Sequence, residues 1–253
     1  MTRSRDTDRD WEQIGAKDPY WGVLSVSTYK SDQLNEESKK EFFDTGEQFI
    51  RKLFSRIHDQ VAEDIEFKRT LDFGCGVGRL VAPLARRSEH VVGVDVSQNM
   101  LDLCHENMAA FGVDNYSLIK GDDTLSTVEG EFDLVNSYIV LQHIPTDRGL
   151  KLIDRLIALT RPGGVAAIHV SFARKMSLLQ HEAVEGQFYR KNEGEITPMI
   201  DRPKQPAEGN VTMYDYDLND VMLRCSTVAD EMLCIPNFGN HIGMQIIFRR
   251  RPA

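Results

Sequence analysis

Positive charge, paired cysteines and long apolar runs are all scarce in this chain of 253 residues. It has 30 lysines and arginines against 39 aspartates and glutamates, and the net charge of −9 disfavours the phosphate backbone of nucleic acids as a partner. No stretch approaches the roughly 18 apolar residues of a membrane span, and the charged N-terminal residues lack the apolar centre of a signal peptide. We therefore expect a cytoplasmic protein without a membrane segment, for which nucleic acid is a poor default partner.

The four cysteines, at positions 75, 104, 225 and 234, form no C-x-x-C pair. Neither a zinc site nor a disulfide framework is therefore predicted, and no group of acidic residues is spaced like a set of metal ligands. We expect reduced thiols, which fit a cytosolic compartment, and no metal cofactor.

Short apolar segments alternate with amphipathic ones through the middle of the chain. Strands are predicted at 70–73, 90–95, 115–120, 132–136 and 165–171, and helices at 36–62, 79–87, 97–111 and 147–159. A helix capped by Asp217 and a closing antiparallel pair at 227–235 and 242–249 follow. Because strands that alternate with helices form right-handed crossovers, we expect a mostly parallel sheet that binds ligands at the carboxyl ends of its strands.

Two segments interrupt this alternation. Residues 11–30 are rich in aromatic side chains, which either pack on the core or form a flap over the active site. Residues 172–214 carry three closely spaced prolines and many charges, and form either an acceptor pocket or lid, or a disordered loop. We expect one domain, 1–253, that comprises an N-terminal flap and helix at 1–62, the α/β core, and an acceptor-side insertion at 172–214.

A glycine-rich turn, LDFGCGVGR at residues 71–79, lies between the first predicted strand and a helix. Its three glycines allow the backbone to turn sharply and to approach a ligand, beside the free N–H groups at the start of the helix. The spacing is G-x-G-x-G, whereas G-x-G-x-x-G indicates a dinucleotide and its pyrophosphate. Asp72, just before the first glycine, would repel a pyrophosphate but suits the ammonium group of an amino acid.

Acidic residues also mark the ends of the next two strands. Asp95 ends the second strand, where a carboxylate can accept hydrogen bonds from both hydroxyls of a ribose. Asp122 and Asp123 follow the third strand, where a carboxylate can accept from an adenine amino group. An acid at three successive strand ends indicates a nucleoside-containing ligand more strongly than the glycines alone.

In their order and spacing, these motifs resemble those of class I S-adenosylmethionine-dependent methyltransferases; the matching stretches are LDFGCGVG, VVGVDVSQNML, IKGDD, FDLVNSYIVLQHIP and RPGG. The resemblance implies a Rossmann-like three-layer sandwich with a mostly parallel seven-stranded sheet and an antiparallel last strand. It also implies S-adenosyl-L-methionine as the cofactor. The residues that it places around the cofactor are Asp72, Gly74, Cys75, Gly76, Gly78 and Arg79 at the methionine part, Asp95, Val96 and Met100 at the ribose and adenine, Asp122 and Asp123 at the adenine amino group, and Asn136 beside the sulfonium.

The acceptor side is marked by fewer residues. An oxygen acceptor must lose its proton, and His143 and Tyr138, in the loop after the fourth strand, are the candidates for this catalytic role. The candidates for binding the acceptor are Tyr20, Trp21 and His181. The same loop begins with the sequence NSYI rather than N/D-P-P-Y/F, which disfavours base nitrogens of nucleic acids and protein glutamine as acceptors.

We therefore predict an enzyme that methylates an oxygen or nitrogen of a small metabolite, such as a sugar or natural product. An RNA or protein methyltransferase is the alternative, and it would require a flat, basic cleft. A non-catalytic S-adenosylmethionine-binding protein and an NAD-dependent oxidoreductase are further alternatives. The intact glycines and acids argue against loss of the cofactor, and the glycine spacing argues against NAD.

Overall fold

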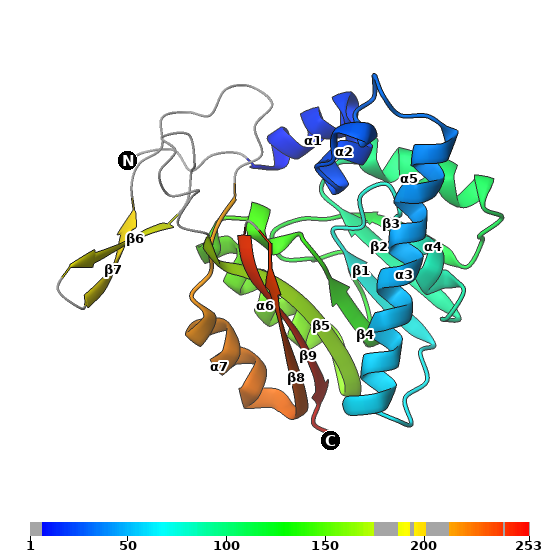
Figure 1. Cartoon of the computed structure of the whole chain (residues 1–253). Helices are drawn as coiled ribbons and strands as arrows, with labels where there is room; N and C mark the ends of the chain where they lie inside the picture. Colours follow the sequence, from blue (N-terminus) through cyan, green and yellow to red (C-terminus); the bar gives the residue numbers. More distant parts are fainter. Residues whose placement is uncertain (1–6, 175–186, 193–194, 201–212, 240, 253) are drawn as a thin grey trace.

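The structure is a computed structural model that describes residues 7–174, 187–192, 195–200, 213–239 and 241–252 (Figure 1). Its main sheet contains β1 (Arg69–Phe73), β2 (His90–Asp95), β3 (Tyr116–Lys120), β4 (Phe132–Ser137), β5 (Thr160–Arg174), β8 (Ala229–Phe238) and β9 (His241–Arg250). The helices are α1 (Thr7–Lys17), α2 (Pro19–Val23), α3 (Glu36–Gln60), α4 (Val81–Ala85), α5 (Gln98–Ala110), α6 (Thr146–Leu159) and α7 (Leu218–Val228). Two 3-10 turns, η1 (Ser27–Tyr29) and η2 (Leu141–His143), and a hairpin of β6 (Gln187–Asn192) and β7 (Glu195–Ile200) complete the described part.

The main sheet has the strand order β3-β2-β1-β4-β5-β9-β8. Strands β1 to β5 are mutually parallel, while β9 runs antiparallel to both β5 and β8. The predicted Rossmann-like sheet, with seven strands and an antiparallel last strand, is confirmed. The chain proceeds outward from β1 on one side and from β4 on the other, and this reversal opens a crevice at the carboxyl ends of β1 and β4.

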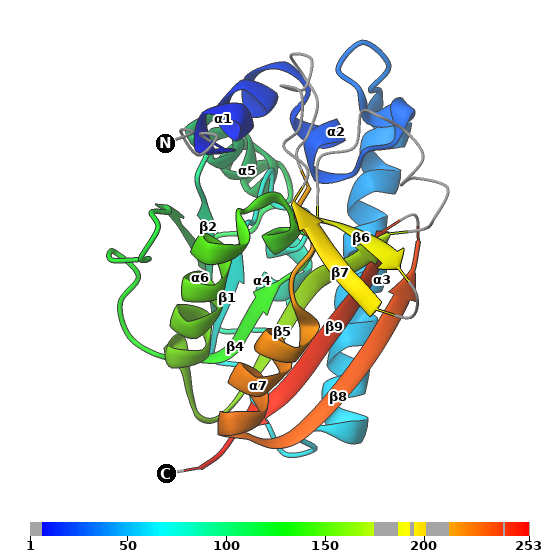
Figure 2. The same cartoon turned by 90° about the vertical axis from the view of Figure 1, so that its left-hand side faces the viewer.

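Helices cover both faces of the sheet and complete a three-layer sandwich (Figures 1 and 2). On one face, α3, α4 and α5 pack around an apolar cluster that includes Leu53 and Leu84. On the other face, α6 and α7 pack around a cluster that includes Leu156 and Val221. Each face therefore has its own core, and the strand ends between the two layers remain open to a ligand.

A third apolar cluster anchors the N-terminal segment on α3 and α5. Tyr20 is buried there, with its ring centroid 5.1 Å from that of Phe42 and its hydroxyl donating to Asn107 Oδ1 at 3.0 Å. Helix α1 lies on α5, where the Glu12 carboxylate accepts from the Gln98 N–H at 2.8 Å. The aromatic residues that the sequence predicts as core or flap therefore serve both purposes. Buried ones such as Tyr20 anchor the N-terminal segment, and the helices that they anchor cover the crevice.

Several elements differ from the prediction. The helix predicted at 79–87 occupies only Val81–Ala85, because the glycine-rich turn continues to residue 80. The predicted stop at 161–164 lies inside β5, where the pairing with β4 shifts register and Gly163 takes a φ of 75°. Much of the predicted insertion, including His181, lies outside the described residues; its described part contains the β6–β7 hairpin, which the sequence did not predict.

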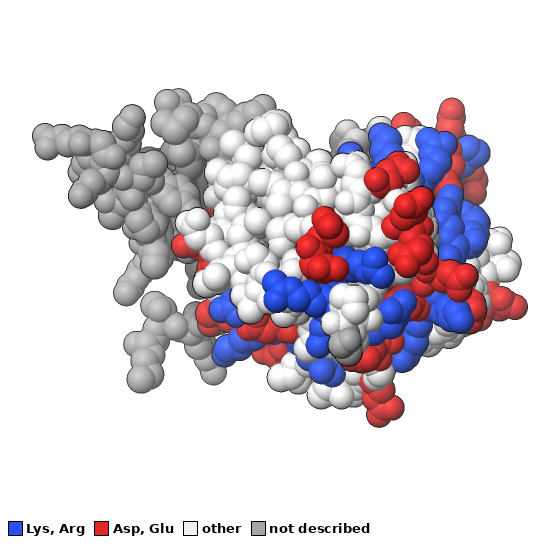
Figure 3. All heavy atoms as spheres, turned by 90° about the horizontal axis from the view of Figure 1, so that it is seen from below, with Lys and Arg blue, Asp and Glu red and all other residues white. Residues whose placement is uncertain are grey.

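Two further observations concern membrane spans and nucleic-acid binding. Within the described ranges, no helix is both long and apolar enough to cross a bilayer. Figure 3 shows acidic and basic side chains intermixed on the face at the lower end of Figure 1. Where that face is described, neither sign of charge forms the continuous field that a nucleic-acid backbone requires.

Tyr216 fastens the loop that follows β4 to the body of the protein. Its ring is buried, its hydroxyl lies 2.9 Å from the carbonyl oxygens of both Leu141 and Ile144, and its N–H donates to the Ser171 carbonyl at 2.7 Å. Helix α6 packs against the hydroxyl through Gly149, where a Cβ atom would overlap it. One residue therefore joins η2, α6 and the end of β5.

We expect Tyr216→Phe to lower the free energy of unfolding by about 1–3 kcal/mol, because the Leu141 and Ile144 carbonyls lose the shared hydroxyl, and Ile144 N–H remains as a donor to Leu141 only. Denaturant unfolding followed by circular dichroism measures this change. Tyr116→Phe is the matched control: its hydroxyl contacts the exposed His105, so we expect a loss below about 0.5 kcal/mol. Equal losses in the two variants would show that the Tyr216 hydroxyl does not hold the loop.

Candidate functional site

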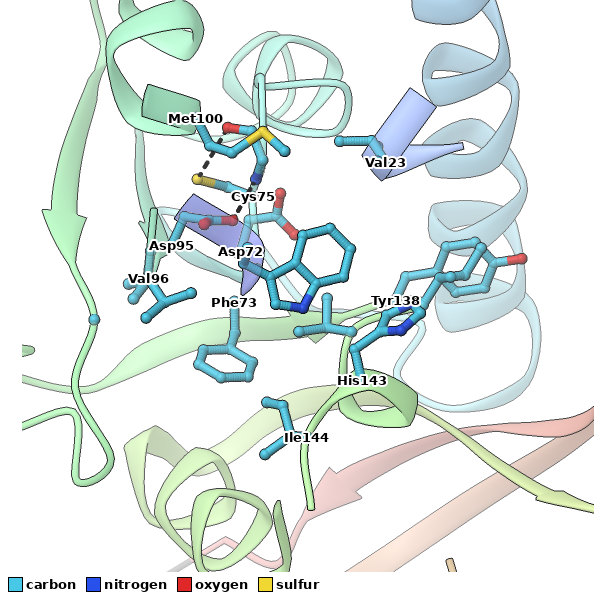
Figure 4. Close-up of a pocket in the computed structure, with 18 of the residues that line it drawn as sticks. Val23, Asp72, Phe73, Cys75, Asp95, Val96, Met100, Tyr138, His143 and Ile144 are labelled. Carbon is cyan, nitrogen blue, oxygen red and sulfur yellow. Dashed lines mark hydrogen bonds between the residues drawn. The ribbon is translucent and has the colours of Figure 1, made fainter. Parts of the chain in front are cut away.

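A cavity lies at the carboxyl ends of β1, β2 and β4, below α1 and α2. The residues that line it come from the N-terminal helices, the glycine-rich turn, the ends of β1 to β3 and the loop after β4. They are Thr7, Asp8, Trp11, Gly22, Val23, Asp72, Phe73, Gly74, Cys75, Gly76, Arg79, Leu80, Val94, Asp95, Val96, Met100, Gly121, Asp122, Tyr138, Ile139, Val140, His143, Ile144, Arg148 and Leu152. Figure 4 shows Asp72, Cys75 and Asp95 on one side of this cavity and Tyr138 and His143 on the other.

The glycine-rich turn brings its backbone to the edge of the cavity. Gly74 and Gly76 have φ values of 76° and 52°, in the left-handed region that favours glycine. A Cβ atom at Gly74 would overlap Val140, and one at Gly76 would lie 2.7 Å from Val23. Gly78 is not in the lining; it faces Cys104 of α5 instead. The turn therefore brings its backbone to the cavity and packs closely on both neighbouring segments, while the N–H groups of Gly74, Cys75 and Gly76 donate to Val94 and Asp95.

Asp72 is a buried carboxylate with one oxygen engaged and one without a partner. Asn136, paired with Asp72 across β1 and β4, donates to Oδ1 at 2.8 Å, while Oδ2 has no hydrogen bond. Burial raises the pKa of Asp72 to about 7, against the opposing effects of the Asn136 hydrogen bond and the Arg79 charge. The resemblance implies that the backbone of Asn136 lies beside the sulfonium; in the structure Asn136 is buried and its side chain supports Asp72 outside the lining.

Arg79 complements Asp72 with a buried positive charge. One guanidinium nitrogen donates to Thr45 Oγ1 at 3.3 Å, and Nε has no hydrogen bond. Burial lowers the pKa of Arg79, and the negative charges around it oppose the change. An ammonium group on Asp72 and a carboxylate on Arg79 would satisfy both residues, so this part of the cavity fits the amino-acid end of S-adenosylmethionine.

Asp95 holds the glycine-rich turn and still presents free lone pairs. Its two carboxylate oxygens accept from the Gly76 N–H and the Ser97 N–H, both at 2.9 Å. Burial raises its pKa to about 6, although these hydrogen bonds oppose the rise. A carboxylate has about four acceptor sites, so it retains the capacity for two ribose hydroxyls. Val96 and Met100 lie beside it in the lining, as an adenosine site requires.

The two acids after β3 have different surroundings. Hydrogen bonds from Ser126 and Thr124 lower the pKa of Asp122, whose carboxylate remains exposed at the edge of the cavity. Asp123 is not in the lining and forms an ion pair with Arg148. Asp122 is therefore placed to meet an adenine amino group, whereas the Asp123 side chain supports the cover of the cavity.

The roof of the cavity, defined by Thr7, Asp8, Trp11, Gly22 and Val23, comes from α1 and α2. Two hydrogen bonds of 2.7 and 2.8 Å join the guanidinium of Arg148 on α6 to the Asp8 carboxylate. The Trp11 ring meets the His143 ring edge-on, with 5.0 Å between the centroids. These contacts close the N-terminal segment over the crevice.

The roof lies in the segment that the sequence predicts as core or flap, but Tyr20 and Trp21, the predicted acceptor-binding residues, are not part of it. Tyr20 is buried against α3 and α5, and Trp21 packs with the same cluster; neither lines the cavity. Trp11 was visible in the aromatic pattern, whereas the ion pair of Asp8 with Arg148 joins positions 140 residues apart and left no local signal.

The loop after β4 contains a strained residue that the sequence does not reveal. Ile139 has a φ of 62°, which is an outlier for a β-branched side chain, and it lies in the lining between Tyr138 and Val140. Backbone strain of this kind often accompanies functional loops. The strain turns the chain so that Tyr138 and His143 both reach the cavity. In the described part of the chain, no three metal-ligating side chains form a cluster.

Comparisons with known proteins agree on the kind of domain. A family of methyltransferase domains matches residues 70–164. The tRNA 5-carboxymethoxyuridine methyltransferase of Escherichia coli (strain K12) is 28% identical over 193 residues, which cover 67% of this chain and 72% of that protein. The ubiquinone biosynthesis O-methyltransferase of Nitrobacter winogradskyi is 34% identical over 125 residues, which cover 47% of this chain and 46% of that protein. The chain thus spans less than half the length of this second relative.

Solved structures share the fold over nearly the whole chain. One is the magnesium protoporphyrin IX methyltransferase of Synechocystis PCC 6803, solved with bound S-adenosylhomocysteine. It superposes with a TM-score of 0.63 and 16% sequence identity, over 96% of this chain and 97% of that chain. The N-methyltransferase NodS of Bradyrhizobium japonicum WM9, in complex with S-adenosylhomocysteine, has a TM-score of 0.60 and 13% identity, and covers 97% of this chain and 99% of its own.

We expect the affinity for S-adenosylhomocysteine to fall about tenfold from pH 8 to pH 6, because an ammonium group prefers the ionised form of Asp72 and the free protein protonates it below a pKa of about 7. Calorimetry across this range measures the change. Asp72→Asn should bind S-adenosylhomocysteine more weakly, and the part of the pH dependence that comes from Asp72 should disappear. A flat profile in the native protein would contradict the role of Asp72.

We expect Asp95→Ala to weaken binding of S-adenosylhomocysteine by about 100-fold or more, because two hydrogen bonds to a carboxylate are lost. Circular dichroism checks that the variant remains folded. Asp102→Ala removes an exposed acid of α5 that accepts from Gln98 and lies outside the cavity lining, and it should bind like the native protein. Native affinity in Asp95→Ala would exclude Asp95 as the ribose ligand.

Proposed function

Because the chain belongs to the Rossmann-like S-adenosylmethionine-dependent methyltransferases, we propose that it methylates an oxygen or nitrogen of a small metabolite, such as a sugar or natural product. The observation that carries this proposal is the roof. Trp11 lies against His143, and Arg148 clamps Asp8, so the cavity is covered where a folded macromolecule would have to approach. Covered cavities that bury most of their ligand suit small molecules.

The cofactor is S-adenosyl-L-methionine, which supplies an activated methyl group on a sulfonium sulfur. Asp72 and Arg79 bind its ammonium and carboxylate groups. Asp95 binds the ribose, Met100 contacts the adenine, and Asp122 accepts from the adenine amino group. Held in this way, the cofactor would present its methyl group to the groups of the loop after β4, and the roof would limit the access of water.

The loop after β4 provides the groups that face the acceptor. His143 lines the cavity beneath Trp11, with its Nε2 3.2 Å from the side-chain nitrogen of Gln142. It is the group that accepts the proton of a hydroxyl acceptor as the new bond to carbon forms, once that hydroxyl replaces the Gln142 amide at Nε2. The Tyr138 hydroxyl points away from Asp72 and Asp95, toward α3 (Figure 4), so Tyr138 orients the acceptor rather than removing its proton.

Methyl transfer to tRNA is the second candidate function, since the Escherichia coli tRNA enzyme matches two thirds of this chain. A nucleotide would have to leave its stack and enter beneath the roof, and the net charge of −9 opposes the approach of the backbone. We therefore rank a small acceptor first.

The decisive assay supplies isotopically labelled S-adenosylmethionine with a panel of small hydroxyl and amino compounds, and in parallel with unmodified tRNA. We expect label in a small product and none in tRNA, with Asp95→Ala as the inactive control. Label in tRNA alone would establish the second candidate. Binding of S-adenosylhomocysteine without any transfer would indicate a non-catalytic binding protein, and the absence of both would overturn the proposed function.

We expect His143→Ala to lower kcat by about 10²-fold or more while the affinity for S-adenosylhomocysteine changes little, because the residue acts on the acceptor proton. His105→Ala, which removes an exposed histidine of α5, is the control and should leave kcat unchanged. A native kcat in His143→Ala would assign the residue a structural role only.

A further inference from the structure

A second hollow lies beside the cofactor cavity, between α3 and the end of the sheet formed by β5, β8 and β9. We call it the cationic recess and define it by Lys52, Arg56, Tyr138, His169, Asn237 and Gln245, which are part of its lining. Tyr138 lines both hollows, so the recess adjoins the cavity at the loop where the acceptor is expected.

The recess forms where the core beneath α3 changes from apolar to polar. Along β5, Val165 and Ala167 face α3 in the apolar cluster, and His169 is the next residue on that face. Along β9, Ile247 belongs to the same cluster, and Gln245 pairs directly with His169. Both polar residues are buried. An apolar residue at either position would extend the core at lower cost, so the polar pair is not explained by packing.

His169 is only 2% exposed, yet neither ring nitrogen has a hydrogen bond. Burial lowers its pKa to about 4, so the ring is neutral at pH 7 and offers one donor and one acceptor. Unpaired buried polar groups are costly and uncommon in folded proteins. Because His169 lines the recess, a ligand there would supply the missing partner.

The charges around the recess are all of one sign. Lys52 and Arg56 lie one turn apart on α3, and Arg56 approaches the Gln245 side-chain oxygen at 3.5 Å. No acidic residue is among the described residues of the lining, although acids outnumber bases in the whole chain by 39 to 30. Two cations and a neutral histidine therefore surround one recess of a protein whose net charge is negative.

Tyr138 links this charge to the reaction. Its ring packs on Phe49 at a centroid distance of 3.9 Å and meets the His169 ring edge-on at 5.1 Å. Burial raises the pKa of Tyr138, while the charges of Arg79 on the cofactor side and Arg56 on the recess side oppose the rise. A molecule in the recess would thus lie along an aromatic wall that leads to the cofactor cavity.

We propose that the cationic recess is the acceptor site and that the acceptor carries an anionic group, a carboxylate or a phosphate, held by Lys52 and Arg56 and hydrogen-bonded by His169. This inference rests on the proposed function and narrows it to acidic small molecules. The apolar part of the acceptor lies on Phe49 and Tyr138, and its nucleophilic atom points past Tyr138 to the methyl group.

Benzoate, methyl benzoate and inorganic phosphate are suitable probes, since they separate the carboxylate, the uncharged ring and the phosphate. Each is titrated calorimetrically into the whole protein, with and without S-adenosylhomocysteine. We expect an anion to bind at least about tenfold more tightly than methyl benzoate, as a charge-assisted pair requires. Stronger binding of benzoate identifies a carboxylate acceptor, and stronger binding of phosphate identifies a phosphorylated one.

The variant Arg56→Gln should weaken anion binding about tenfold while leaving the affinity for S-adenosylhomocysteine intact. Arg51→Gln is the matched control, because it removes the same charge from an exposed position of α3 outside the recess. Anion binding that is absent, or equally affected in both variants, would overturn the recess. Failure to bind S-adenosylhomocysteine would instead overturn the proposed function, and the titrations without it would still test the recess.

The variant His169→Leu separates binding from structure. We expect anion affinity to fall while the Tm stays level or rises by about 2–4 °C, because an unpaired buried polar group is removed. In the methyl-transfer panel, acids should react and their neutral esters should not. Transfer to uncharged compounds alone, with KM unchanged in Arg56→Gln, would also overturn the proposal.

Discussion

The parallel register of β1 with β2 and β4 is the constraint on which the site depends. It places Asp72 opposite Gly93 on one side and Asn136 on the other, so the carboxylate is oriented by a neighbouring strand before any ligand arrives. The turn after β1 then crosses to β2, where Asp95 accepts from the Gly76 N–H. Because each strand contributes one polar end to the same edge, the sheet itself sets the spacing of the groups that hold the cofactor. The helices on both faces stabilise that sheet, and α5 and α6 add Met100, Arg148 and Leu152 to the lining.

The protein retains unfavourable polar burial in the two hollows. Asp72 and Arg79 in the cofactor cavity, and His169 in the cationic recess, each bury an atom without a hydrogen-bond partner. Ile139 adds backbone strain between the two hollows. Such local costs are tolerated where a ligand relieves them, and the extensive apolar clusters on both faces of the sheet offset them. The stability of the fold and the chemistry of the site are therefore located in different layers of the molecule.

The sequence predicted what depends on local pattern and missed what depends on tertiary packing. Strand periodicity located β1 to β5, and Asp217 was identified as a helix cap because its side chain accepts from a nearby backbone N–H group. Asp72, Asp95 and Asp122 were found because strand ends meet at one edge. Tyr20 and Trp21 were predicted to bind the acceptor, and the core or flap role of residues 11–30 stayed open, because an aromatic pattern does not say which side chain faces the core. Arg148 and Ile139 left no sequence signal, since one depends on a partner 140 residues away and the other on a conformation that its residue type disfavours.

The clamp between Arg148 and Asp8 has a kinetic consequence. The roof comes from α1 and α2, so exchange of the cofactor past it would require α1 to move away from α6 and from the Asp123 loop. Both ion pairs are partly exposed, so dissolved ions screen them and the helix opens more often as ionic strength rises. Cofactor exchange by this route would depend on surface charges. It would then contribute to the turnover rate alongside the methyl-transfer step.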